Sequence, residues 1–305
     1  MAFRGSIRMS RRLRWLIGSV AIAAAVWFAA LWVGGSIAAA PARARIGAPP
    51  ADLPVEAITI ASASGSRLSG WFIAGAPHGG AVLLMHGVHA NRLEMLDRAR
   101  LLHRAGFAVL LFDFQAHGES TGEAITFGYL ESKDARAAFE ELRRRAPGER
   151  VGVLGLSLGG AAAILSDPPL AADAMVLEAV YGSFAIAVEN RVAMHLGAVG
   201  PYVAPVLTTM LLWQVKPRLG FDPDILRPSA RIADLHMPLL LIAGDADEHA
   251  TLAEMKSIYA NANDPKEIWI IPGARHQDFQ RYARAEYERR VVAFLRGHLQ
   301  GHLRD

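Results

Sequence analysis

The sequence predicts an α/β protein with a mostly parallel sheet that helices cover on both faces. Short runs rich in Val, Leu and Ile, such as AVLLMH at residues 81–86 and FAVLLFD at residues 107–113, alternate with amphipathic stretches. Strands that are apolar throughout, rather than at every second position, are typical of parallel strands buried on both faces. No internal repeat and no linker divides residues 55–305, which predicts a single domain there.

The individual elements follow in order along the chain. Residues 57–60 and 67–73 are expected to form a β-hairpin. Strands are predicted at 81–86, 107–113, 150–157, 174–179, 238–244 and 266–273, and helices at 93–106, 129–145, 158–166 and 279–299. The helix at 129–145 has acids early and arginines late, which complements the helix dipole.

Residues 184–236 interrupt this alternation, because they contain no clear strand. We expect a small helical lid, interrupted by Pro201 and Pro205, that covers the carboxyl ends of the strands. Its apolar side chains have two interpretations of equal weight, the lining of an acyl pocket or ordinary core packing. They are Met194, Leu196, Tyr202, Val206, Leu207, Met210, Leu211 and Trp213.

The N-terminal part differs in composition from the rest. Residues 15–40 carry no charged side chain, and a helix of that length crosses a bilayer. Residues 1–51 hold seven arginines and no acid, and removing these from the total of 32 basic residues leaves 25 against 29 acidic ones. The pI of about 9.4 therefore belongs to this part and does not indicate a nucleic-acid partner.

These features predict a basic segment at 1–14, a transmembrane signal-anchor at 15–40, a linker at 41–54 and a folded domain at 55–305. Five arginines precede the apolar run, so the positive-inside rule predicts a single-pass protein with a cytoplasmic N-terminus and an extracytoplasmic domain. A cleaved signal peptide is the minor alternative. Its apolar region is normally only about 7–15 residues long, and Pro41 would follow the cut after Ala40.

The candidate chemistry begins at Ser157, in the pentapeptide GLSLG. In a parallel α/β sheet, ligands bind at the carboxyl ends of the strands, and this serine directly follows one. A turn tight enough to expose a serine hydroxyl crowds the backbone, and small residues two positions away on either side relieve the crowding. The helix that begins at Leu158 directs its free N–H groups toward the serine oxygen.

A serine nucleophile needs a base, and the base needs an acid that orients it. His276 is the histidine that follows the last strand in a glycine-containing loop, and Asp245 and Asp247 follow the preceding strand. The backbone N–H groups of Leu158 and Val88 are the expected oxyanion donors. We expect His86 and His117 to hydrogen-bond loops around the site and His89 to face solvent.

Four sequence blocks, in order, resemble those of the α/β-hydrolase superfamily, and in particular its serine-aminopeptidase-like and esterase-like serine hydrolases. They are HGVHANR at 86–92, FDFQAHGES at 112–120, GLSLGG at 155–160, and GDADEHA at 244–250 with GARH at 273–276. The resemblance implies the α/β-hydrolase fold and a catalytic triad of Ser157, Asp247 and His276, with Asp247 preferred over Asp245. It departs from the family pattern at Gln115, where relatives often carry arginine.

These observations predict a membrane-anchored serine hydrolase that cleaves an ester or thioester of a small apolar acyl substrate, a carboxylesterase-like activity. A serine peptidase of the aminopeptidase-like type is the alternative enzyme, and a non-catalytic membrane-tethered binding protein is the alternative of another class. The absence of cysteine excludes disulfides and thiolate metal sites, and no cluster has metal-ligand spacing, so we expect neither cofactor nor metal. The sequence leaves the oligomeric state open.

Overall fold

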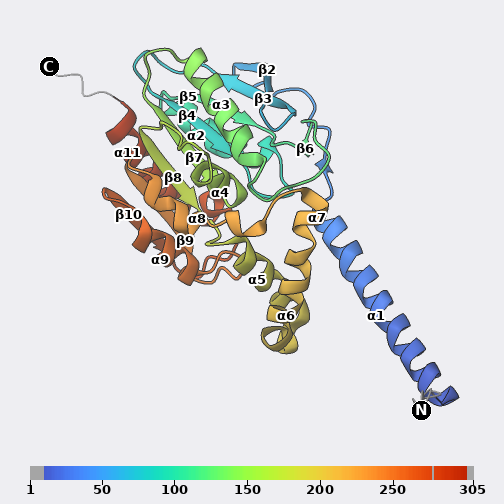
Figure 1. Ribbon diagram of the computed structural model, residues 1–305. Helices are drawn as coiled ribbons and strands as arrows, with labels where there is room; N and C mark the ends of the chain where they lie inside the picture. Colours follow the sequence, from blue (N-terminus) through green and yellow to red (C-terminus); the bar gives the residue numbers. More distant parts are fainter. Residues whose placement is uncertain (1–9, 277, 301–305) are drawn as a thin grey trace. The chain divides into compact units, whose positions relative to one another are not determined.

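A computed structural model describes residues 10–276 and 278–300 of the chain (Figure 1). The chain divides into two compact units, residues 1–39 and 40–305. The first nine residues of the predicted basic segment lie outside the described residues. In the first unit, α1 (Arg11–Ala38) begins at Ser10, whose side chain accepts a hydrogen bond from the Leu13 amide. All but a few of its side chains are exposed, and its length and composition suit a membrane anchor or a signal sequence.

The second unit is built on an eight-stranded sheet with the strand order β10-β9-β8-β7-β4-β5-β3-β2. Its strands are β2 (Val55–Ala61), β3 (Arg67–Ile73), β4 (Ala81–Met85), β5 (Ala108–Phe112), β7 (Val151–Leu156), β8 (Ala174–Glu178), β9 (Leu239–Gly244) and β10 (Lys266–Ile271). The strands from β10 to β5 in this order pair in parallel, and β2 and β3 form the predicted antiparallel hairpin at one edge. The predicted α/β class is confirmed.

Helices cover both faces of the sheet and bury two separate apolar cores. One core joins strand residues such as Leu83 and Leu110 to α3 (Glu131–Arg145), α4 (Leu158–Ile164) and α9 (Leu252–Asn261). The other joins alternate strand residues such as Val82 and Leu111 to α2 (Leu96–Arg104) and α11 (Arg284–Leu299). Because the side chains of a strand alternate between the two faces, strands that are apolar throughout supply both cores.

Two elements differ from the sequence prediction. The last helix is divided into α10 (Phe279–Tyr282) and α11 by Ala283, whose backbone leaves the helical region at φ −123° and ψ 45°. Inside the predicted linker, β1 (Ala42–Arg43) pairs in parallel with β6 (His117–Gly118). The Ala42 amide donates to the Ala116 carbonyl at 2.8 Å, so these linker residues belong to the second unit.

The segment between β8 and β9 contains helices only, and we refer to residues 184–234 as the insertion. Its elements are α5 (Phe184–Leu196), η2 (Gly197–Val199), α6 (Gly200–Trp213), α7 (Val215–Leu219), η3 (Pro223–Ile225), α8 (Pro228–Arg231) and η4 (Ile232–Asp234). Pro201 lies in the first turn of α6, where no intrahelical donor is needed, and Pro205 lies inside the helix. Pro201 therefore marks the start of a helix, and α6 continues past Pro205 without a break. In Figure 1, α5 and α6 project from the rest of the second unit.

Candidate active site

Ser157 lies in a sharp turn between β7 and α4, at the carboxyl edge of the sheet. Its backbone has φ +50° and ψ −108°, a conformation that is costly for any residue with a side chain. The Ser157 amide donates to the Glu178 carbonyl at 2.7 Å, and its own carbonyl accepts from the Ala161 amide at 3.0 Å, inside α4. These bonds hold the serine at the start of a helix in a strained conformation.

Three glycines make this turn sterically possible. A Cβ atom on Gly155 would lie 2.5 Å from the Gly160 nitrogen. A Cβ on Gly159 would lie 2.3 Å from the Met85 carbonyl oxygen, and one on Gly160 would lie 2.4 Å from a Val180 methyl. Only glycine therefore allows α4 to pack this closely against β4 and the end of β8.

His276 and Asp247 form a hydrogen-bonded pair in the loops that follow β10 and β9. The His276 Nδ1 lies 2.8 Å from Oδ2 of Asp247, and the Asp247 side chain is 0% exposed. Oδ1 of Asp247 accepts from the amides of His249 and Ala250 at 2.8 and 2.9 Å. A carboxylate oxygen accepts hydrogen bonds, so Nδ1 of His276 is the ring nitrogen that carries the proton. In the neutral ring, Nε2 then keeps a lone pair that can accept a proton.

The structure brings the predicted acid and base into contact, but it does not join them to the serine. Among residues 10–276 and 278–300, the Ser157 hydroxyl makes no hydrogen bond. Hydrogen bonds of catalytic groups often tighten only when substrate is bound. The other candidate acid, Asp245, is engaged elsewhere, since its Oδ1 accepts from the Gly273 amide at 2.6 Å.

One predicted oxyanion donor follows Ser157 directly in the chain, and the other lies in the loop after β4. Leu158 is the first residue of α4, and Val88 follows β4 by three residues. Within the described part of the chain, neither amide donates a hydrogen bond. The neighbouring Gly87 lies close to the serine, because a Cβ built on it would be 3.8 Å from the Ser157 Cβ. The Gly87 amide donates to Glu94 at 2.7 Å, which fixes the loop.

His86 and His117 are buried and connect the loops after β4 and β5. Nε2 of His86 accepts from the Phe114 amide at 3.1 Å, and its Nδ1 lies 2.7 Å from the Gly87 carbonyl. Nε2 of His117 accepts from the His89 amide at 3.1 Å in the same way. An Nε2 that accepts carries no proton, so both rings are neutral. Burial lowers the pKa of His86 to about 3 and also lowers the pKa of His117.

Gln115, the departure from the family pattern, supports the loop after β5 through its amide. Nε2 of Gln115 donates to the Ala124 carbonyl at 2.6 Å and to Glu131 at 2.9 Å, and the residue is buried. The glutamine thus replaces the charged donor that an arginine would supply.

A buried ion network that the sequence analysis missed holds the histidine loop. Arg98 pairs with Glu178 at 2.7 Å and with Asp278 at 3.2 Å, and Asp278 also caps α10. The Tyr287 hydroxyl donates to Glu178 as well. Glu178 is the residue whose carbonyl accepts from Ser157, so one arginine connects the serine turn to the loop that carries His276. A charged residue on the apolar face of the helix at 93–106 was the available sequence signal.

The insertion contacts the acid loop through α5. Nδ2 of Asn190 donates to the His249 carbonyl at 3.2 Å and to Glu254 at 2.9 Å. The His249 ring lies beside the His276 ring, with centroids 4.9 Å apart. Burial is the main cause of the lowered pKa of His249, and the nearby His276 adds to it. The neighbouring Arg191 is also partly buried, which lowers its pKa.

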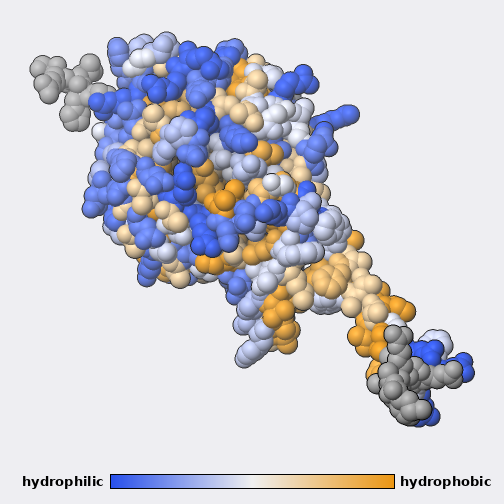
Figure 2. Space-filling view, in the orientation of Figure 1, coloured by the Kyte–Doolittle hydropathy of each residue, from blue (hydrophilic) through white to orange (hydrophobic). Residues whose placement is uncertain are grey.

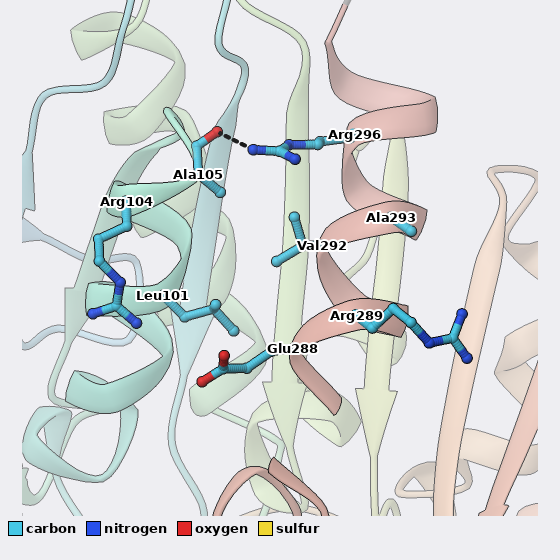
Figure 3. A pocket seen from close by; sticks show the side chains of 8 residues that line it. All are labelled: Leu101, Arg104, Ala105, Glu288, Arg289, Val292, Ala293 and Arg296. Atoms are coloured by element: carbon cyan, nitrogen blue, oxygen red, sulfur yellow. Dashed lines mark hydrogen bonds between the residues drawn. The ribbon is translucent and has the colours of Figure 1, made fainter. Parts of the chain in front are cut away.

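The described residues contain no group of three or more His, Cys, Asp or Glu side chains that could hold a metal ion. A groove of about 420 Å³ lies between α2 and α11 and is lined by residues such as Leu101, Val292 and Arg296 (Figure 3). It adjoins the end of α2 that leads into β5, so it lies toward the amino ends of the strands, away from Ser157.

Comparisons with known proteins place this chain in a family. Residues 76–220 match the family model described as serine aminopeptidase, S33. An uncharacterized protein of Mycobacterium tuberculosis is 31% identical over 233 residues, which cover 72% of each chain. The alpha/beta hydrolase domain-containing protein WAV2 of Arabidopsis thaliana is 28% identical over 247 residues, 74% of each chain.

Among solved structures, the Pyrococcus furiosus esterase Pf2001 is similar, with a TM-score of 0.69 and 25% identity. The likeness covers 86% of this chain and 98% of the esterase. The chain belongs to the α/β-hydrolase superfamily, as the four sequence blocks predicted. It is therefore a hydrolase by family.

Proposed function

We propose that this protein is a serine hydrolase that cleaves an ester or thioester of an apolar acyl substrate, with Ser157, His276 and Asp247 as its catalytic triad. The observation that carries the proposal is the His276–Asp247 hydrogen bond at 2.8 Å, formed by loops that follow β10 and β9. Ser157, in the strained turn after β7 at φ +50°, supplies the candidate nucleophile. The likeness to an esterase at 25% identity supports an ester substrate. The apolar helix α1, which suits a membrane anchor, favours an apolar acyl group that partitions into the same membrane.

The reaction follows from the roles of these groups. Nε2 of His276 takes the proton of the Ser157 hydroxyl as the oxygen attacks the carbonyl carbon. Asp247 accepts from Nδ1 and stabilises the imidazolium that forms. The amides of Val88 and Leu158 donate to the developing oxyanion. The imidazolium then protonates the leaving alcohol or thiol, and water activated by the same histidine hydrolyses the acyl-enzyme.

A fluorophosphonate probe tests the nucleophile directly. We expect covalent labelling of the full-length protein and none of Ser157→Ala, with peptide mapping to residue 157. Unlabelled wild type, or equal labelling of the variant, would overturn the proposal. It would instead favour the non-catalytic binding protein.

A serine peptidase is the second candidate, because the matching family model is described as a serine aminopeptidase. Rates on p-nitrophenyl esters of increasing chain length and on aminoacyl p-nitroanilides separate the two activities. We expect turnover of the esters with a preference for longer acyl chains. Turnover of the amides alone would replace the esterase proposal by the peptidase.

We also propose that α1 anchors the protein in a membrane, with its N-terminus in the cytoplasm and the second unit outside. The 28-residue helix has a mean hydropathy of 2.2 over its most apolar window, and arginines precede it. A C-terminal fusion to a reporter active only outside the cytoplasm tests the orientation. An inactive reporter, paired with activity of a cytoplasmic reporter at the same site, would contradict it.

A further inference from the structure

The insertion carries a long uncharged surface on α6. Residues 192–215 contain no Asp, Glu, Lys or Arg. The side of α6 that packs on α5 is built from small residues, Gly200, Ala204 and Thr208, which are all buried. A Cβ on Gly200 would lie 2.2 Å from the Ala193 carbonyl oxygen, so the two helices are in close contact there. Within the described residues of the second unit, the opposite side of α6 is exposed.

That opposite side presents large apolar side chains to solvent. Tyr202 is 84% exposed, Val206 58% and Trp213 69%, and Thr209 is exposed between them. Positions 202, 206, 209 and 213 follow a spacing of four, three and four, which places them on one helix face. Figure 2 shows hydrophobic surface on this projecting part of the second unit. We call these four residues the α6 stripe.

The exposure of Tyr202, Val206 and Trp213 excludes core packing, one of the two interpretations that the sequence allowed for these side chains. The apolar stretch Phe184–Leu219 has a mean hydropathy of 1.4 in its most apolar window, yet only 17% of that window is buried. A helix that packs in a protein core is mostly buried, so Tyr202, Val206 and Trp213 are not core residues.

We propose that the α6 stripe docks on the surface of a lipid bilayer. With 13 and 14 residues, α5 and α6 are each shorter than the roughly 20 residues that span a bilayer, so the helix lies in the interface. Tyr202 and Trp213, at the two ends of the stripe, are the residue types enriched at membrane interfaces. Exposed Lys216 follows directly and suits anionic headgroups.

The connection to α1 selects a bilayer over a second copy of the chain as the occupant. This step rests on the proposed anchorage. Only Ala39–Pro41, three residues, separate the end of α1 from β1, which is hydrogen-bonded into the second unit. Fully extended, the span from Ala38 to Ala42 reaches at most about 14 Å. An anchored α1 therefore keeps the second unit at the membrane surface at high effective concentration.

Docking at this face would place the site next to the membrane, because α5 contacts both α6 and the acid loop. Asn190 of α5 binds the His249 carbonyl, and His249 stacks beside His276. A membrane-borne acyl ester would then reach the site along the insertion without entering bulk water. The stripe thus identifies the substrate class as esters that partition into bilayers.

Single-cysteine labelling tests the docking, and the absence of natural cysteine makes it specific. The full-length Val206→Cys variant carries a nitroxide label in vesicles of phosphatidylcholine and phosphatidylglycerol, and Glu140→Cys on α3 is the matched exposed control. We expect high accessibility to oxygen and low accessibility to a water-soluble nickel reagent at 206, and the reverse at 140.

A water-accessible label at 206, in protein that floats with the vesicles, would overturn the docking and leave the anchorage intact. Protein that does not float would overturn the anchorage, and dipolar broadening at 206 would show a second copy instead.

Activity measurements provide the second test. Val206→Asp should lower the rate on a long-chain ester presented in vesicles by about tenfold, because a charge replaces buried apolar surface at the interface. Its rate on p-nitrophenyl acetate in solution should stay within about twofold of wild type. Ile225→Asp, another exposed apolar position of the insertion outside the stripe, is the control and should leave both rates unchanged. Equal losses on both substrates for Val206→Asp would contradict the proposal.

Discussion

The acid loop offers two aspartates two residues apart, and their contacts assign them different tasks. Asp247 accepts from His276 and two amides, whereas Asp245 accepts from the Gly273 amide. An aspartate that accepts from Nδ1 fixes the tautomer in which Nε2 is the base. An aspartate that accepts a hydrogen bond from a backbone amide of a neighbouring loop only holds the conformation of that loop.

We therefore expect Asp247→Asn to lower kcat by about 10³–10⁴-fold, since the amide stabilises the wrong histidine tautomer. Asp245→Asn, the matched control, should lower kcat by less than about tenfold. Steady-state rates on a p-nitrophenyl ester measure both, with circular dichroism to show that each variant is folded. A larger loss at 245 than at 247 would reassign the acid.

The motif residues could be predicted from the sequence because each one follows a strand end within a short local pattern. Ser157, Asp247 and His276 are of this kind, and so are the loops with Val88 and Leu158. Arg98 could not be assigned its task in this way. Its partners Glu178 and Asp278 are 80 and 180 positions away in the chain, and only the packed fold brings them together.

At the scale of elements, the packing of α4 on the sheet depends on glycines whose neighbours leave no room. Gly159 has the Met85 carbonyl where a Cβ would be, whereas exposed Gly297 in α11 has no atom within 4 Å. We expect Gly159→Ala to destabilise the protein by about 2–3 kcal/mol through overpacking. Gly297→Ala should stabilise it by about 0.5–1 kcal/mol, because alanine is the better helix former.

Urea unfolding of the full-length variants in detergent, followed by tryptophan fluorescence, measures both changes. Equal changes in the free energy of unfolding for the two substitutions would show that helix propensity, rather than steric fit, determines the stability of these variants. Activity of Gly159→Ala adds a second readout. A shift of α4 away from β4 would also displace Ser157, so the rate should fall even at temperatures where the variant is folded.

The strands of the sheet could be predicted because each one is marked by the apolar composition of its own segment. Elements that form only through contacts with distant residues could not be predicted in this way. The strands β4, β5, β7, β8 and β9 are short, mainly apolar runs whose burial follows from composition. The pairing of β1 with β6 depends on backbone hydrogen bonds between segments about 75 positions apart in the chain, and no side-chain pattern predicts it. The α6 stripe has the composition of a core helix, so only the structure shows that it is exposed.

For the whole molecule, buried histidines make stability depend on pH. His86 is 0% exposed, and its pKa falls from 6.5 to about 3 on folding. Between these values the unfolded chain binds a proton that the native state does not bind. The free energy of unfolding therefore decreases as the pH falls from about 6.5 toward 3, by up to about 1.4 kcal/mol per pH unit. The lowered pKa of His117 acts in the same direction.

Asp134 opposes this effect, because burial raises its pKa from 3.8 to about 6. Between these values the native state holds the extra proton, so acidification stabilises it over the same window. Asp134→Asn should therefore make stability fall more steeply between about pH 6 and 4, by up to about 1.4 kcal/mol per pH unit. Urea unfolding at intervals across this range measures the slope, which is independent of any constant change in hydrogen bonding to Ser62 and Gln115. Glu140 is exposed on the same helix, and Glu140→Gln is the control. Its free energy of unfolding should vary with pH in parallel with that of the wild type. A parallel curve for Asp134→Asn would show that its carboxyl does not titrate as its burial requires.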